Sequence, residues 1–524
     1  MSSLISAFKK VYLALLIVSL LFGLCSNAIA ETAAAEQCAA IENLSIQDTH
    51  LLNAYVVEAK DDLPEYCRVT GYVLPSIHFE VRLPTSNWNG KFYMAGCGGY
   101  CGSVMDRKGF TNAMNYGLYR NYVVATTDMG HWGKSMFDGT WAYNARQKEI
   151  DFGYRSTHEV TRAAKEIIKA YYGNGPSHSY FAGCSNGGRQ AIMEAIRYPE
   201  DFDGIISGAP ALDWTGLVGT HGSWIIQANR GVGDKPIIDN EHLDLIAKAV
   251  YGKCDGIDGL VDGIIVDPTK CPFDPASLLC GESETEDCLT PEQVIALKKF
   301  YGGAKDSSGN QLYAGGLPLG SETFWDLWII GGKPGPYGGV LPALMKLLTN
   351  DHLRYTAYET DCPTCTPYDF DFDVDPAKAK NMAAILNATS PDLAKFKKTG
   401  GKLIMYQGWA DPAVTPFATV DYYESVMEKM GSLENTKDFF ILYMVPGMAH
   451  CQIPPGVGPD NFDLLTALED WVEKGVTPTG IIASQLTKEQ QVVRTRPLCP
   501  YPEVPKYKGA GSTDDAANFN CERP

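Results

Sequence analysis

A serine and a histidine, each in a glycine-containing turn, are the residues of this chain best suited to nucleophilic catalysis. Ser185 is the centre of the sequence Gly-Cys-Ser-Asn-Gly, and His450 lies in Pro-Gly-Met-Ala-His-Cys. A serine hydroxyl becomes a nucleophile when a base accepts its proton, and histidine, with a pKa near 6.5, is the usual base. Each residue has a cysteine neighbour, Cys184 and Cys451, so a disulfide between these cysteines would tie the two turns together.

The surroundings of Ser185 predict a nucleophile elbow. Gly-x-Ser-x-Gly alone is weak evidence, because a plain turn in a chain with 52 glycines has the same composition. Here a short apolar strand at residues 179–182 precedes the serine and a helix at residues 187–197 follows it. A strand, a sharp turn carrying serine and a helix are the context in which this pattern exposes a hydroxyl above a sheet.

The order of the elements selects the base and the acid. In this hydrolase layout the acid and then the histidine follow the serine. The histidines after Ser185 are His221, His242, His352 and His450. Only His450 follows a predicted core strand, since the other three lie in an irregular segment. We choose Asp411 as the acid because it follows the predicted strand 402–408 directly and would orient the imidazole and stabilise its cation.

Backbone N–H groups must stabilise the negatively charged oxygen of an acyl-transfer intermediate. The residue after the nucleophile, Asn186, is expected to supply one. The glycine-rich turn after the predicted strand 91–94 is expected to supply the other, from Gly98 or Gly99.

The elements that position these residues predict an α/β fold, an α/β-hydrolase core with a large inserted lid. We expect an antiparallel hairpin of residues 77–83 and 91–94, turning at Thr-Ser-Asn-Trp-Asn-Gly. Further predicted strands are 122–126, 205–210, 402–408 and 439–445, and predicted helices are 157–171, 291–300 and 461–474. Rich in Gly, Pro, Asp and Cys, residues 212–399 would form the inserted domain between core parts 31–211 and 400–524.

The first thirty residues are typical of an export signal. Lys9 and Lys10 precede an apolar run, which Ala-Ile-Ala follows as a cleavage site. The run is shorter than the roughly 20 residues that span a bilayer, so we expect no membrane anchor after cleavage. Lipid attachment at Cys25 is the weaker alternative. Loss of the two lysines changes the net charge from −18 to about −20, which argues against nucleic acid or an anionic membrane as a partner.

The cysteine content indicates disulfides in an oxidising compartment, either the periplasm or outside the cell. Of the 15 cysteines, 14 remain without Cys25, enough for seven bridges, although the count alone does not fix their connectivity. Local spacing favours pairs Cys97 with Cys101, Cys254 with Cys271, Cys280 with Cys288, and Cys362 with Cys365, while Cys38 with Cys67 and Cys499 with Cys521 would hold the termini. Cys184 and Cys451 are the remainder.

Taken together, the elbow sequence with its Gly-Gly-Arg-Gln extension, Asp411 and the His450-Cys451 pair resemble the tannase and feruloyl esterase family. The likeness covers nearly all of the predicted mature chain. The resemblance implies that bonded cysteines beside the catalytic serine and histidine hold the two together. It also implies that the inserted domain is a lid over the aromatic acyl group and contains a structural calcium ion.

The stretch matching the calcium site is Cys-Asp-Gly-Ile-Asp-Gly-Leu-Val-Asp-Gly-Ile. Calcium binds six to eight oxygens. The oxygens expected here are the carboxylates of Asp255, Asp258 and Asp262 and the carbonyls of Leu260 and Ile264. By composition alone, an ordinary Asp/Gly surface loop would look the same.

The substrate implied by the resemblance is a small aromatic ester: feruloyl or another hydroxycinnamoyl ester, a galloyl ester, or mono(2-hydroxyethyl) terephthalate. Trp325 and Trp328 are candidates to line the acyl pocket, and packing in the lid core is the alternative. No arginine is identified that would bind a terephthalate carboxylate, although Arg354 is a candidate, and plant phenolic esters are therefore favoured. A non-catalytic secreted binding protein is the rival from another class. The sequence does not predict the oligomeric state.

Overall fold

The computed structural model describes residues 33–104, 113–281, 287–334 and 340–524. The predicted export signal at residues 1–30, with Cys25, lies outside these residues. Among the described residues, no helix has the length and apolar character needed to cross a membrane.

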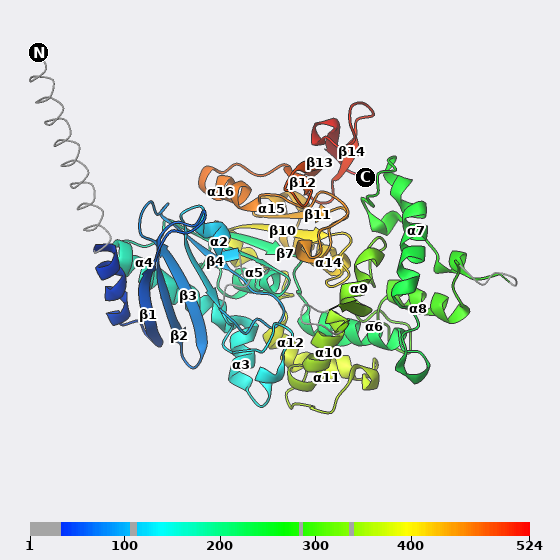
Figure 1. Cartoon of the computed structure of the whole chain (residues 1–524), viewed down its shortest axis with the longest axis horizontal. Coiled ribbons are helices and arrows are strands. Elements are labelled where there is room, and N and C mark those ends of the chain that lie inside the picture. Colours follow the sequence, from blue (N-terminus) through cyan, green and yellow to red (C-terminus); the bar gives the residue numbers. More distant parts are fainter. Residues whose placement is uncertain (1–32, 105–112, 282–286, 335–339) are drawn as a thin grey trace, which may run out of the picture.

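A nine-stranded mixed sheet forms the centre of the molecule (Figure 1). Its strands are β1 (Thr49–Val57), β2 (Tyr66–Val73), β3 (Ile77–Pro84), β4 (Lys91–Ala95), β5 (Val123–Thr127), β6 (His178–Cys184), β7 (Gly204–Gly208), β10 (Lys402–Gly408) and β11 (Phe440–Val445). They are ordered β1-β2-β3-β5-β4-β6-β7-β10-β11. The strands are parallel from β5 to β11, while β1, β2 and β3 add an antiparallel edge. This sheet with its covering helices is the predicted α/β-hydrolase core.

The predicted hairpin of residues 77–83 and 91–94 is wrong. Both segments are strands, but β5 lies between them and pairs antiparallel with β3 and parallel with β4. The turn after β3 instead carries the chain across the end of β5, where the Asn89 N–H donates to the carbonyl of Asn121. The sequence of a strand that is buried on both faces does not indicate which strands lie beside it. The alternation of apolar and polar residues indicates which face of a strand is buried, and it carries no information on strand pairing.

Helices cover both faces of the sheet. Those of the core are α2 (Ala113–Leu118), α3 (Arg146–Ile150), α4 (Ser156–Tyr172), α5 (Asn186–Arg197), α14 (Pro416–Met430), α15 (Leu433–Lys437) and α16 (Leu464–Lys474). Apolar side chains of α4, α5 and α14 share one buried cluster with the sheet, and those of α2 and α16 share the other. The helices predicted at 157–171 and 187–197 are confirmed as α4 and α5, whose apolar residues recur at helical spacing.

In its described residues, the segment between β7 and β10 adds no strand to the main sheet. It contains helices α6 (Gly222–Ala228), α7 (Leu243–Cys254), α8 (Pro291–Gly302), α9 (Trp325–Trp328), α10 (Leu344–Tyr355), α11 (Asp375–Lys378), α12 (Lys380–Leu386) and α13 (Ala394–Thr399), and the hairpin β8 (Gly331–Pro334) with β9 (Val340–Pro342). Much of it packs around its own apolar cluster. Figure 1 shows it beyond the ends of the parallel strands, beside the core. We call residues 212–399 the inserted segment.

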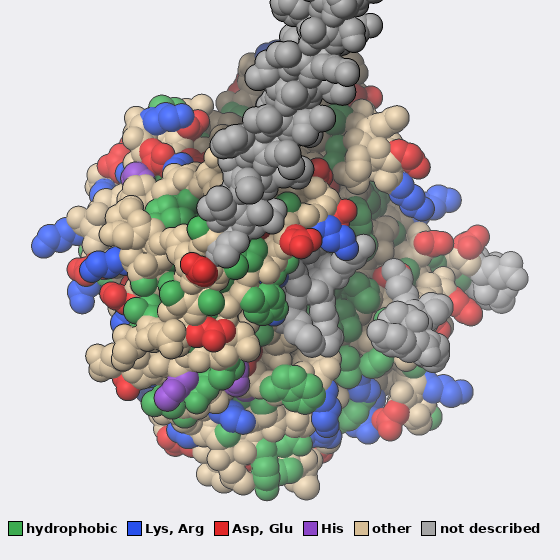
Figure 2. Space-filling model, turned by 60° about the vertical axis from the view of Figure 1, so that its left-hand side comes forward, with side chains coloured by type: hydrophobic (Ala, Val, Ile, Leu, Met, Phe, Trp, Pro, Cys, Tyr) green, Lys and Arg blue, Asp and Glu red, His purple; other side chains and the backbone are tan. Residues whose placement is uncertain are grey.

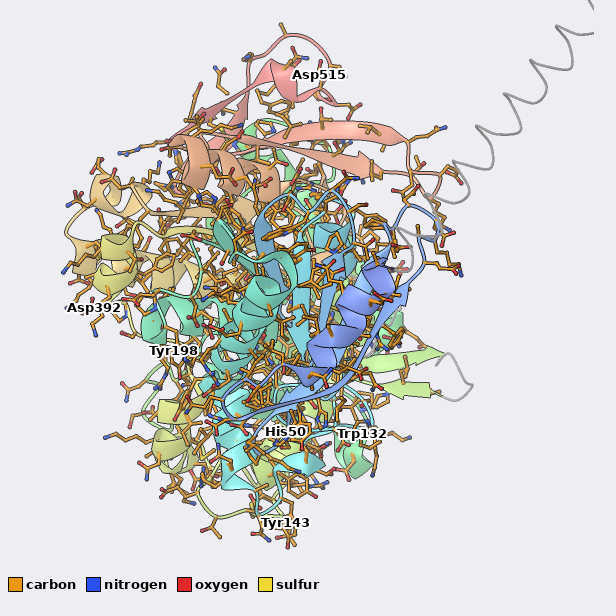
Figure 3. The ribbon with its side chains drawn as sticks, turned by 90° about the vertical axis from the view of Figure 1, so that its left-hand side faces the viewer. His50, Trp132, Tyr143, Tyr198, Asp392 and Asp515 are labelled. Carbon is orange, nitrogen blue, oxygen red and sulfur yellow. A yellow bond between two sulfur atoms is a disulfide. The ribbon has the colours of Figure 1, made fainter. Side chains whose placement is uncertain are left out.

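The C-terminal region forms two small antiparallel pairs, β12 (Ile481–Leu486) with β13 (Val492–Leu498) and β14 (Val504–Tyr507) with β15 (Phe519–Glu522). In Figure 3, Asp515 marks this region at the opposite end of the molecule from Tyr143. The surface in Figure 2 has acidic and basic side chains interspersed. The sequence patterns missed these four strands, as well as β1 and β2.

The cysteines of the described chain form seven disulfides: the six pairs predicted from their positions in the sequence, and the remaining pair, Cys184 with Cys451. Six of them join residues at most 29 positions apart. The seventh joins Cys184 to Cys451, which are 267 positions apart.

Candidate active site

Ser185 occupies the sharp turn between β6 and α5. Its backbone has φ 64° and ψ −122°, a left-handed φ that is strained for a residue with a side chain. A Cβ atom on Gly183 would lie 2.6 Å from the carbonyl carbon of Gly187, so the turn closes only with glycine there. The Ser185 N–H donates to the Gly208 carbonyl at 2.9 Å, which fixes the turn to β7. The elbow predicted from the sequence is therefore present.

Asp411 and His450 meet at the ends of β10 and β11. Nδ1 of the imidazole lies 2.7 Å from Oδ2 of Asp411, and both side chains are buried. Asp411 Oδ1 accepts the N–H groups of Ala413 and Val414 at 2.8 and 2.9 Å, and Oδ2 also accepts Nε2 of Gln407 at 2.9 Å. These bonds hold the carboxylate in one orientation, which in turn fixes the ring of His450.

The Cys184–Cys451 disulfide joins the elbow to the histidine turn. Its Cα atoms lie 6.0 Å apart, and Cys451 Sγ is 3.7 Å from His450 Nε2. Among the described residues, no hydrogen bond links Ser185 Oγ to His450. The parallel strands and the bridge between the neighbouring cysteines bring the two turns to the same edge of the sheet. Catalytic hydrogen bonds commonly tighten only around a substrate.

The glycine loop after β4 packs against the start of α5. The Gly96 N–H donates to the Ala182 carbonyl at 2.9 Å, and the loop is closed by the Cys97–Cys101 disulfide. Gly99 has φ +56°, and a Cβ atom there would lie 2.2 Å from the carbonyl oxygen of Met136. Glycine is thus required at position 99, one of the two predicted oxyanion donors.

Asn186 is the first residue of α5, so its N–H has no acceptor within the helix. Its side-chain Nδ2 donates to Cys101 Sγ at 3.3 Å. The two segments predicted to supply oxyanion donors are therefore in direct contact.

The inserted segment reaches the histidine through α9. The ring of Trp328 lies edge-on to that of His450, with centroids 4.9 Å apart. Trp325 instead packs on Phe300 and Tyr301 in the core of the inserted segment, and its indole N–H donates to Ser321 Oγ at 2.8 Å. Of the two predicted pocket residues, Trp328 therefore lies beside the site. Trp325 packs in the core of the inserted segment, which was the alternative interpretation of its sequence.

The predicted calcium ligands lie on one loop, residues 255–264, which we call the acidic loop. Asp255 accepts the backbone N–H groups of Asp262, Gly263 and Ile264 at 3.0–3.2 Å. Asp262 pairs with Arg496 of β13. Burial raises the pKa of Asp258, and the negative charges of Asp262 and Asp255 raise it further.

No three His, Cys, Asp or Glu side chains in the described part of the chain are arranged to hold one metal ion. In this arrangement, backbone amides and an arginine occupy oxygens of Asp255 and Asp262 that an ion would use. The donor set of the acidic loop has the chemistry that calcium prefers, but its side chains do not converge on one point.

The sequence predicted no individual role for three residues near the site, although Arg189 belongs to the Gly-Gly-Arg-Gln extension of the elbow sequence. Gln407 binds Asp411, Phe324 of the inserted segment packs with Ala410 beside it, and Arg189 lies buried behind the elbow. A polar side chain at the end of an apolar strand and an arginine in an apolar helix are weak signals, since exposed positions give the same pattern.

The comparisons with known proteins agree with this geometry. The family model described as "Tannase and feruloyl esterase" matches residues 63–522. A mono(2-hydroxyethyl) terephthalate hydrolase of Piscinibacter sakaiensis is 35% identical, with 88% of this chain and 85% of that protein aligned. An uncharacterized esterase of Xanthomonas campestris pv. campestris is 34% identical, over 94% of this chain and 93% of that protein. The crystal structure of feruloyl esterase B from Aspergillus oryzae superimposes with a TM-score of 0.80 at 26% identity, covering 93% of this chain and all of that one (100%).

Proposed function

This chain belongs to the tannase and feruloyl esterase family and is a carboxylic ester hydrolase, and we propose that it hydrolyses aromatic esters through an acyl-enzyme on Ser185. The observation that carries the proposal is the hydrogen bond between Asp411 and His450 next to the elbow of Ser185. A disulfide between the neighbouring residues Cys184 and Cys451 joins the turn of Ser185 to the turn of His450. A nucleophile, a base and an orienting acid in these positions are the requirements of serine ester hydrolysis.

Ser185 Oγ attacks the ester carbonyl while His450 accepts its proton. Asp411 holds the imidazole by Nδ1, which leaves Nε2 as the proton acceptor, and stabilises the imidazolium. The N–H groups of Asn186 and of Gly98 or Gly99 bind the oxyanion. His450 then returns the proton to the leaving alcohol, and a water molecule activated by the same imidazole releases the aromatic acid.

The acyl group is an aromatic acid of the hydroxycinnamoyl or galloyl class. Trp328 is the proposed aromatic wall of the pocket, since it is the tryptophan in contact with His450. The candidate arginine for a terephthalate carboxylate, Arg354, donates instead to the Cys365 carbonyl at 3.3 Å. The 35% identity to a terephthalate monoester hydrolase makes that monoester the second candidate. Turnover of methyl ferulate, methyl gallate and mono(2-hydroxyethyl) terephthalate distinguishes the three.

Export, the lid and calcium complete the proposal. Residues 1–30 act as an export signal, and seven disulfides in the described chain suit an oxidising compartment. Residues 212–399 act as a lid over the acyl pocket. A calcium ion bound by Asp255, Asp258, Leu260, Asp262 and Ile264 holds the base of this lid and takes no part in the reaction. Three carboxylates within one short loop support this role, and Asp255 and Asp262 would exchange their present amide and arginine partners for the ion.

The substitution Ser185→Ala tests the catalytic assignment. We expect hydrolysis of a chromogenic aromatic ester to fall by at least about 10⁴-fold, with an unchanged melting temperature. A fluorophosphonate should label the parent protein and not the variant. Ser277→Ala, on the inserted segment, should keep both labelling and turnover. Acylation bursts in folded Ser185→Ala would refute the assignment.

A further inference from the structure

Arg189 is a fully buried cation directly behind the proposed nucleophile. It lies on the first turn of α5, and its exposed fraction is 0%. Nε donates to Asn186 Oδ1 at 2.7 Å, and Nη2 donates to the Phe152 carbonyl at 3.0 Å. Nη1 donates to the carbonyls of Gly153 and Leu386 at 2.9 and 2.8 Å.

No carboxylate neutralises this guanidinium among the described residues. The other buried arginines contrast with it: Arg82 pairs with Glu80 at 2.7 Å, and Arg496 pairs with Asp262. Instead, the aromatic rings of Phe152 and Trp214 face the guanidinium, with their centroids 4.8 and 5.6 Å from its central carbon, Cζ. Burial lowers its pKa to about 9, so the group is still charged at neutral pH. Burying a charge without a counter-ion is unfavourable, and cores that need only packing use apolar side chains.

The bonds of Arg189 lead to both sides of the proposed oxyanion hole. Asn186, held by Arg189, donates from its amide to Cys101, and Cys101 is bonded to Cys97 in the glycine loop. The next residue, Gln190, binds the same loop through the N–H and the carbonyl of Cys97 at 3.4 and 3.3 Å. Arg189 also reaches Leu386, in the last turn of α12 in the inserted segment.

We propose that Arg189 is a positioning residue for transition-state stabilisation in this esterase. It fixes Asn186 against the glycine loop, and its unneutralised charge favours the negative charge that develops on the substrate oxygen nearby. The proposal rests on the proposed function, because it assigns the oxyanion to the N–H groups of Asn186 and the glycine loop. A fixed charge in a site shielded from water acts without reorganisation and favours the transition state over the ground state.

The test compares Arg189→Met, Arg189→Lys and the parent enzyme. In Arg189→Met we expect kcat for a chromogenic ester to fall about 100-fold, with KM changed less than about threefold. The affinity for an aryl trifluoromethyl ketone, which forms an oxyanion adduct with serine, should fall by a similar factor. Arg189→Lys, which keeps the charge, should recover part of both losses. The control Arg155→Met removes a half-buried arginine that pairs with Asp151 and should leave the ketone affinity unchanged.

Equal loss of kcat and ketone affinity in Arg189→Met and Arg189→Lys would reject the charge contribution. Unchanged values in a folded Arg189→Met would reject the proposal entirely. If Arg189→Met fails to fold, Asn186→Ala is the second test, because it removes the side chain that links Arg189 to Cys101 and keeps the guanidinium of Arg189. That variant should then lose ketone affinity without a matching rise in KM, and unchanged affinity would overturn the positioning role. Fluorophosphonate labelling of Ser185 in the parent protein is scored separately. Its failure would refute the proposed function and with it this inference, whereas a labelled parent enzyme with unchanged kinetics in Arg189→Met would reject this inference alone.

Discussion

The sheet edge that carries Ser185, Asp411 and His450, which we call the catalytic edge after its proposed role, and the acidic loop both contain charged and polar residues. The two regions are assembled in opposite ways. Ser185, Asp411 and His450 come from three separate segments. They lie at one edge of the sheet because parallel strands end there and because the Cys184–Cys451 bridge joins two of the turns. The acidic loop draws its carboxylates from ten consecutive residues. A site assembled from distant segments depends on many tertiary contacts that hold the segments together, whereas a site within one loop depends on few of them.

The two regions also differ in how their carboxylates are balanced. Asp411 receives three donors besides His450, so its charge is fully engaged by the protein. In the acidic loop, Asp262 has Arg496, while the pKa of Asp258 is raised by burial and by its two acidic neighbours. The catalytic edge is thus complete without any added group, and the acidic loop is the region whose charges a cation would relieve.

Among the changes that compare these two regions, removal of the long-range bridge should have the largest effect. In Cys184→Ala/Cys451→Ala we expect kcat to fall about 100-fold with little change in KM, because the loss concerns the position of the serine relative to the histidine. Closure of a loop of 267 residues also contributes roughly 5 kcal/mol by chain entropy, an upper value for measured disulfides. Steady-state kinetics and denaturant unfolding give the two quantities.

The matched control is Cys362→Ala/Cys365→Ala, which opens a bridge of sequence separation 3 in the inserted segment. It should leave kcat within about twofold of the parent value. Unchanged turnover in the Cys184/Cys451 double variant would show that Asp411, the elbow and the sheet position the site without a covalent link.

The catalytic edge was the more predictable region, because each of its residues carries a local signature. The elbow around Ser185 and the turns after β10 and β11 follow apolar strands whose limits the sequence reproduces within one or two residues. The neighbouring cysteines then indicated which of these turns meet. The proximity of two segments far apart in the sequence could be predicted here only because each segment contains a cysteine that can form a disulfide.

The pairing of strands in the sheet and the ion-pair partners of buried charged residues could not be predicted in the same way. The hairpin expected before β4 failed because β5, further along the chain, inserts between its two strands. The burial of Arg189 and the pairing of Arg496 were not predicted because an arginine is ordinarily exposed. No local pattern shows that one is buried behind a helix or paired with a distant loop. Both features depend on the assembled tertiary structure.

Calcium should stabilise the acidic loop by an intermediate amount. At a free concentration 100 times the dissociation constant, binding to the folded state alone adds about 2.7 kcal/mol. We expect the melting temperature to fall by several degrees in a chelator and to recover with added calcium. Asp258→Asn should abolish this response. Asp244→Asn, an exposed carboxylate on α7, should retain it.

Elemental analysis of the purified protein gives a second measure, with about one calcium per chain expected and less in Asp258→Asn. A melting temperature indifferent to calcium and chelator, with no bound metal, would mean that Asp255 and Arg496 close the loop by themselves. The acidic loop would then be as self-sufficient as the catalytic edge.

Glu322 tests the smallest effect, at the junction of the two regions. It is buried on η10 (Glu322–Phe324), where it accepts from Tyr301 Oη and the Gly320 N–H at 2.8 Å each. The Tyr251 hydroxyl, on the helix that leads to the acidic loop, donates to the Gly320 carbonyl, and Trp328 on the following helix contacts His450. Burial raises the pKa of Glu322 from 4.5 to about 7.

Because this pKa is higher in the folded state, the contribution of the proton to stability is complete below pH 4.5 and is lost as the pH rises through about 7. Between pH 5 and 7.5 the loss amounts to about 2 kcal/mol. Glu322→Gln cannot ionise, so its unfolding free energy should vary less over this range, whereas Glu241→Gln, at an exposed position, should follow the parent curve. The difference between the curves isolates Glu322 from Glu149, whose pKa is also raised to about 7. Parallel curves for Glu322→Gln and the parent would contradict the shift. A matching change in the pH profile of kcat would show that ionisation in the inserted segment reaches His450 through Trp328, and that the two regions do not act independently.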